Sequence, residues 1–183
     1  MRRGLAGLAT AAVLVVACGS VQPAPSADGQ ALDLRAEGSG FALEVRLPSA
    51  TLDSADAIPL QAGLTWIGPA ARTQLWASGS GIVTFQYREV GGQRRSIIGV
   101  MTSDCRVYDF DQGRPVAVPP GKSWSADGSD PNLAFYKAWG ADPALHLPPG
   151  HWRIVVGTDA LLAPCDLDAP PLKLSIPFEL TMR

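Results

Sequence analysis

The segment Phe41–Leu47 reads Phe-Ala-Leu-Glu-Val-Arg-Leu and carries a large apolar residue at every odd position. Glu44 and Arg46 stand between these apolar residues. Successive side chains of a strand point to opposite faces, so this alternation predicts a strand with one face buried and one face in solvent. The period of two, in place of the 3.6 of a helix, is the dominant rhythm of the chain from residue 31 onward.

The same alternation predicts a series of short strands. We expect them over residues 60–66, 73–77, 83–88, 95–101, 105–110, 114–118, 152–156 and 172–180. Gly91 and Gly92 are suited to a hairpin turn between the third and fourth of these. Pro177 has no N–H for a ladder hydrogen bond, which places the last strand at a sheet edge or beside a bulge.

One segment has the signals of a short helix. Asp130 is suited to capping, Pro131 to the first helical position, and Gly140 to the position just beyond the end. Such a helix has only about two turns, so its stability must come from packing.

Seven to nine short strands with one short helix predict an all-β fold, an immunoglobulin-like Greek-key β-sandwich. Residues 147–156, Leu-Pro-Pro-Gly-His-Trp-Arg-Ile-Val-Val, resemble the start of a late strand in bacterial immunoglobulin-like domains. Secreted lipoproteins and the bacterial intracellular proteinase inhibitor family contain similar segments. The resemblance covers roughly residues 133–182 and implies the fold, and no functional residue is carried over from it.

The beginning of the chain has the plan of a secretory signal peptide. Arg2 and Arg3 precede an uncharged run from residue 4 to residue 17, which is shorter than the roughly 20 residues of a membrane-spanning helix. The run ends in Val15-Val16-Ala17-Cys18, which resembles the lipobox of bacterial lipoproteins. That resemblance implies removal of residues 1–17 and a lipid on Cys18; the alternative is an ordinary cleaved signal with an incidental cysteine.

The predicted organisation is therefore a signal peptide (1–17), a flexible tether (18–30) and one domain (31–183). The tether is small, polar and proline-bearing, with little apolar surface to support a fold. The whole chain has a net charge of −2, and the part after residue 17 has 13 basic and 17 acidic residues. No basic run suggests binding to nucleic acid or to anionic lipid. We therefore expect membrane contact only through the lipid on Cys18, on the extracytoplasmic side.

Two cysteines remain once Cys18 is lipidated. Cys105 and Cys165 form an even pair in an oxidising compartment, which favours a disulfide. The alternatives are two free thiols or a metal site, although zinc sites need further closely spaced cysteines or histidines.

The sequence offers no convincing catalytic, metal or cofactor motif. His146 and His151 are the only histidines, and nothing in the sequence fixes a third ligand beside them. Asp104, Asp109 and Asp111 lack the regular spacing of a calcium loop. We therefore expect a protein that is not an enzyme and needs no cofactor.

A binding surface is the remaining candidate. The connection over residues 119–150 carries Trp124, Phe135, Tyr136 and Trp139, and connections of this length are often functional. Tryptophan and tyrosine are frequent anchors in protein interfaces. The alternative is that these aromatic side chains form a lid over one open end of the core.

These observations favour a non-catalytic binding or structural module of the cell envelope, whose partner is an envelope protein or glycan. One alternative is an inhibitor of secreted proteases, which depends on fold analogy alone. A less favoured alternative is an envelope hydrolase.

Lipidation of Cys18 is the first testable prediction. Mass spectrometry of the mature N-terminal peptide should find an acylated Cys18, and Cys18→Ala should leave the signal segment attached. An unmodified N-terminus at another residue would contradict the lipobox interpretation.

Overall fold

The computed structural model describes residues 30–99, 102, 104–121, 124, 128–165, 168 and 170–183. The predicted signal peptide, Cys18 and all of the predicted tether except Gln30 lie outside the described residues. Within the described part of the chain, no helix is both long enough and apolar enough to span a membrane.

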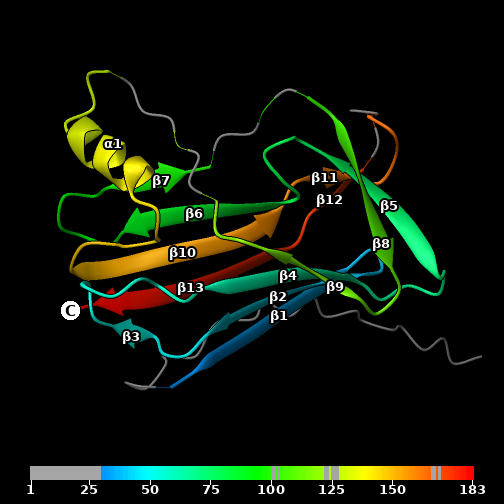
Figure 1. Ribbon diagram of the computed structural model, residues 1–183, viewed down its shortest axis with the longest axis horizontal. Coiled ribbons are helices and arrows are strands. Elements are labelled where there is room, and N and C mark those ends of the chain that lie inside the picture. The colour runs from blue at the N-terminus through cyan, green and yellow to red at the C-terminus, as the bar shows by residue number, and fades with distance from the viewer. Residues whose placement is uncertain are drawn as a thin grey trace, which may run out of the picture.

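Thirteen strands in three sheets and one short helix make up these described residues (Figure 1). Sheet A has the order β1 (Leu32–Gly38), β2 (Phe41–Leu47), β4 (Gln61–Trp66) and β9 (Pro115–Val118). Sheet B has the order β3 (Thr51–Leu52), β13 (Ser175–Met182), β10 (Gly150–Thr158), β6 (Val83–Glu89) and β7 (Ser96–Ile98). Sheet C has the order β12 (Pro171–Leu172), β11 (Ala160–Leu161), β5 (Arg72–Ala77) and β8 (Arg106–Asp111).

The pairing in sheets A and B follows the immunoglobulin pattern. In sheet A, β4 pairs antiparallel with β2 and β9. In sheet B, β10 pairs antiparallel with β6 and β13. These sets correspond to the A–B–E and C–F–G strands of an immunoglobulin sandwich. The predicted fold class, an all-β sandwich with one short helix, is confirmed, although the strands outnumber the seven to nine that we expected.

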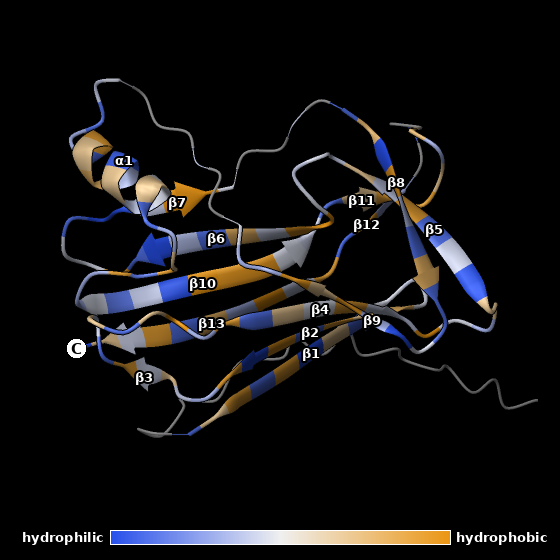
Figure 2. Cartoon of the chain, viewed as in Figure 1, coloured by the Kyte–Doolittle hydropathy of each residue, from blue (hydrophilic) through white to orange (hydrophobic). Residues whose placement is uncertain are grey.

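The core lies between the inner faces of sheets A and B. On β10, Trp152, Ile154 and Val156 are completely buried, and Leu43 and Val45 are buried in the same way on β2. Figure 2 shows hydrophobic and hydrophilic residues alternating along β1 and β13, as a two-layer sandwich requires. Burial of each such aliphatic side chain stabilises the fold by about 1.5–3 kcal/mol.

Pro177 lies where β13 has a single neighbour among the described strands. It is opposite Val155 of β10, whereas β3 joins the other edge of β13 only at Thr181 and Met182. The proline therefore sits on a locally unpaired edge, as its missing N–H predicts.

Sheet C is an elaboration at one end of the sandwich. Strands β5 and β8 pair antiparallel over six residues and form a ribbon that projects from the two main sheets (Figure 1). The ribbon is attached to the core by Phe110 of β8, which packs edge-on against Phe41 of β2 with ring centroids 5.3 Å apart. One face of the ribbon is thereby buried and the other remains in solvent.

The helix α1 (Leu133–Ala141) begins later than the sequence signals suggest, and Gly140 is inside it. Asn132 is the N-cap residue, and Asp130 instead accepts a hydrogen bond from the Asn132 N–H at 2.7 Å. Pro131 therefore precedes the helix. Gly140 is the last helical residue but one and makes room for Trp124, because a Cβ at residue 140 would lie 2.3 Å from the Trp124 indole nitrogen.

Helix α1 covers one end of the core, above β6 and β7 (Figure 1). Tyr136 and Trp139 are each only 4 % exposed, and the Trp139 ring lies 5.7 Å from the ring of Tyr87 on β6. The Tyr136 hydroxyl accepts a hydrogen bond from the Ser96 N–H of β7. These contacts make the two aromatic side chains part of the hydrophobic core.

An ion pair joins this lid to the sandwich. Both carboxylate oxygens of Glu89 accept hydrogen bonds at 2.9 Å from the Arg95 guanidinium, and both side chains are largely buried. The guanidinium stacks over Phe135 of α1 and Trp152 of β10, at 4.9 and 5.4 Å. The hydrogen bonds from Arg95 hold the pKa of the Glu89 carboxyl below its usual value.

Trp139→Ala should therefore destabilise the full chain by about 3–5 kcal/mol, because it leaves a large cavity under α1. For a chain of this size, thermal unfolding should show a melting temperature lower by roughly 10 °C. Ile98→Ala is a matched control, because Ile98 is 49 % exposed on β7 and should change the stability by less than about 0.5 kcal/mol. Equal melting temperatures for the two variants would contradict the lid.

Candidate functional site

The solvent face of the β5–β8 ribbon collects side chains of mixed chemistry. Residues alternate along β5, so that Leu75 faces the core and is completely buried, whereas Arg72, Gln74 and Trp76 lie on the other phase. The strand register places β8 partners opposite each of these three: Asp111 opposite Arg72, Asp109 opposite Gln74, and Val107 opposite Trp76.

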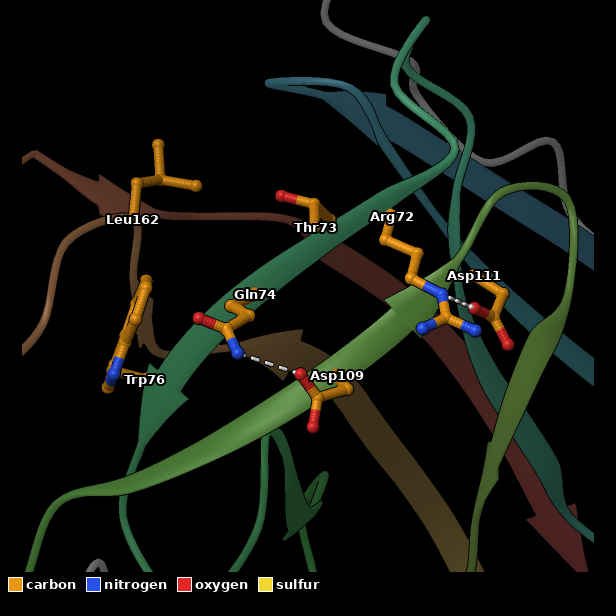
Figure 3. A pocket seen from close by; sticks show the side chains of 7 residues that line it. All are labelled: Arg72, Thr73, Gln74, Trp76, Asp109, Asp111 and Leu162. Carbon is orange, nitrogen blue, oxygen red and sulfur yellow. Dashed lines mark hydrogen bonds and ion pairs between the residues drawn. The ribbon is translucent and has the colours of Figure 1, made fainter.

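These side chains line an open groove of about 770 Å³, within the range of small-molecule sites in proteins. Its lining residues are Arg72, Thr73, Gln74, Trp76, Asp109, Asp111 and Leu162 (Figure 3). Figure 3 shows Trp76 and Leu162 at one end, the Gln74–Asp109 pair in the middle, and the Arg72–Asp111 pair at the other end. The groove therefore has an apolar end and a polar end.

Two cross-strand pairs fix the polar side chains. The Gln74 amide donates to Asp109 Oδ1 at 2.8 Å, and Arg72 Nε lies 2.8 Å from Asp111 Oδ1. The Arg72 side chain is 84 % exposed, so its ion pair contributes little to stability. The two pairs orient the donors and acceptors of the groove and add little to the stability of the fold.

Trp76 differs from the other four tryptophans of the chain. Trp139 and Trp152 are buried in the core, and Trp66 and Trp124 are partly buried and packed against it. Trp76 belongs to neither group and is partly exposed on the solvent face of β5. Val107 and Leu162 beside it are 50 % and 37 % exposed, which makes this end of the ribbon an exposed apolar surface.

A disulfide fixes one wall of the groove. Cys105 and Cys165 are bonded, with their Cα atoms 5.9 Å apart, so the pairing expected from the cysteine count is present. Cys105 immediately precedes β8, and Cys165 follows Leu162 by three residues. The bond therefore holds the segment carrying Leu162 next to the ribbon carrying Val107 and Asp109.

A network of hydroxyl groups closes the end of the ribbon beyond Trp76. Ser78 Oγ lies 2.7 Å from the hydroxyls of Ser80 and Thr102, and Asp104 accepts hydrogen bonds from the Thr102 hydroxyl, the Gly79 N–H and Arg106. These bonds, that of Thr102 first, lower the pKa of Asp104 to about 2. Asp104 therefore belongs to this hydroxyl network, whereas Asp109 and Asp111, close to it in sequence, line the groove.

The two histidines have different partners. His146 Nδ1 lies 2.6 Å from Asp142 Oδ2, and His151 Nδ1 lies 3.1 Å from the Thr181 hydroxyl. In the part of the chain that the structure describes, no group of three or more His, Cys, Asp or Glu is arranged to hold a metal ion.

The aromatic residues that the sequence suggested as an interface are mostly covered. Tyr136 and Trp139 are buried, and Trp124 and Phe135 are partly buried against the core. Trp76 was not among the residues predicted to form a site, although its position in the strand carried a signal. In a strand whose other phase is Thr73, Leu75 and Ala77, a tryptophan in phase with an arginine and a glutamine faces solvent.

No protein-family model matches the sequence, and no curated protein gives a significant match to it.

The disulfide gives a prediction for stability. Replacing Cys105 and Cys165 together by serine should reduce the free energy of unfolding by about 4 kcal/mol in the chain-entropy model, because the bond closes a loop of 60 residues. Urea unfolding should show the same loss when the native chain is reduced, and reductant should not affect the double variant. An unfolding midpoint of the native chain that reductant does not shift would contradict this contribution.

Proposed function

We propose that this protein is a lipid-anchored, extracytoplasmic, non-catalytic binding module of the cell envelope, and that the groove on the β5–β8 ribbon receives its ligand. The observation that carries the proposal is Trp76. Trp76 is partly exposed and lies outside the core cluster, so the fold leaves part of its large apolar surface in contact with water. Tryptophan is also one of the residues enriched among the energetic anchors of binding surfaces.

The preorganised polar side chains support the same role. Gln74 and Arg72 are held by Asp109 and Asp111, so a ligand meets them already oriented. Preorganisation lowers the entropic cost of binding. The disulfide adds a covalent restraint on the wall that carries Leu162.

The proposed anchor is compatible with a groove that faces away from the membrane. The tether precedes β1, which starts at Leu32, and β1 ends at Gly38 beside Phe41. Phe41 packs on Phe110 of the ribbon, so Leu32 lies about 20 Å away along β1, at the opposite end of the sandwich (Figure 1). A lipid on Cys18 would attach the domain to the bilayer through that opposite end, and the flexible tether would leave the groove accessible.

Site-specific photo-cross-linking in the producing cells tests this function. A photoreactive side chain at Val107, directly opposite Trp76, should form an adduct with an envelope component, and Trp76→Ala should abolish that adduct. The same photoreactive group at Ile98, equally exposed but on β7, is the control and should form no such adduct. Adducts from both positions, or from neither, would contradict a binding site on the ribbon.

A further inference from the structure

We infer that the ligand of this groove is a neutral saccharide, with Trp76 as the platform for a sugar ring and Gln74 and Asp109 as the groups that bind its hydroxyls. This inference rests on the proposed function, because it names the ligand class of the same groove.

The apolar end of the groove fits the face of a sugar ring. A pyranose ring presents a face of C–H groups that is apolar and slightly positive, and an indole presents a flat face that is electron-rich. Val107 is opposite Trp76 on β8 and Leu162 lines the groove beside it, and both side chains are exposed and form no hydrogen bonds. A wholly polar ligand would leave this end unmatched, whereas a sugar ring has both an apolar face and a polar rim.

The middle of the groove fits that polar rim. The bond between Gln74 and Asp109 uses one of the two amide hydrogens and one of the two carboxylate oxygens. The pair therefore keeps one amide donor, the amide oxygen and the second carboxylate oxygen for a ligand. Neighbouring hydroxyls of a sugar each donate and accept, so one ring can satisfy both kinds of group at once.

The spacing of the groove suits an extended chain of sugars. Residues two apart on a strand are separated by about 7 Å, so Arg72, Gln74 and Trp76 sample about 14 Å along one direction. A ring stacked on Trp76 would place the next part of the chain over Gln74 and then beside Arg72.

The charge of the groove selects a neutral saccharide over an acidic one. Asp111 is paired with two arginines, Arg72 at 2.8 Å and Arg114 at 3.8 Å, whereas Asp109 accepts a hydrogen bond from the neutral Gln74 amide. The carboxylate of a uronic acid ring next to Trp76 would therefore approach the negative charge of Asp109 in the middle of the groove. A neutral ring meets no such repulsion.

Calorimetric titration of the full chain, in a detergent without a sugar headgroup, tests the inference. The probes are hexasaccharides of glucose and of N-acetylglucosamine, with a hexasaccharide of galacturonic acid as the acidic comparison. We expect at least one neutral probe to bind, and the acidic probe to bind at least about tenfold more weakly. Trp76→Ala should weaken binding of the neutral probe by about tenfold or more, and Gln74→Ala by roughly fivefold.

Two further variants separate stacking from folding. Trp76→Phe keeps an aromatic platform and should retain most of the affinity, and Ile98→Ala should leave affinity unchanged. Failure of every neutral probe to bind, equal binding of the acidic probe, or unchanged affinity in Trp76→Ala would each overturn the saccharide inference. A Trp76-dependent cross-link from Val107 to a protein without sugar would also overturn it while leaving the proposed binding function intact, whereas absence of any cross-link would remove both.

Discussion

The structure depends on the burial of β10 at the centre of sheet B. Trp152, Ile154 and Val156 of this strand have no exposed surface, so β6 and β13 must flank it and sheet A must cover it. Near the start of β10, the Arg95 guanidinium lies over the Trp152 ring and donates a hydrogen bond to the Glu89 carboxylate. An arginine so placed requires its carboxylate, because an unpaired buried charge would cost several kcal/mol.

This arrangement explains why one end of the sandwich is closed and the other is available. Near Trp152, helix α1 closes the core with Tyr136 and Trp139. At the far end, β5 and β8 leave the two main sheets as a ribbon whose inner face is fixed by Phe110 and Leu75. The side chains on the outer face of that ribbon do not pack in the core, so they are available to a ligand.

Much of the fold could be predicted from the sequence, because a period of two is a direct record of burial. The alternation over 41–47 and 152–156 predicted β2 and β10, but we overlooked the same alternation in β1, where the inward residues include the small Ala36 and Gly38. Two-residue strands such as β3 carry no period at all. The helix start was misplaced because Asp130 and Asn132 both suit a cap, and only packing selects between them. Composition shows that residues 119–150 are rich in aromatic residues, but it does not show which of these side chains pack into the core. The phase of β5 did carry a signal for Trp76, which we overlooked.

The central claim is that Trp76, which is partly exposed and lies outside the core cluster, presents its ring to solvent, whereas Trp139 and Trp152 are buried. Incorporation of 5-fluorotryptophan gives five ¹⁹F resonances, and Trp76→Phe assigns the one of interest. Added to the unliganded full chain, a soluble nitroxide should broaden the Trp76 resonance and leave the resonances of the buried Trp139 and Trp152 sharp. A Trp76 resonance as protected as that of Trp152 would contradict the account.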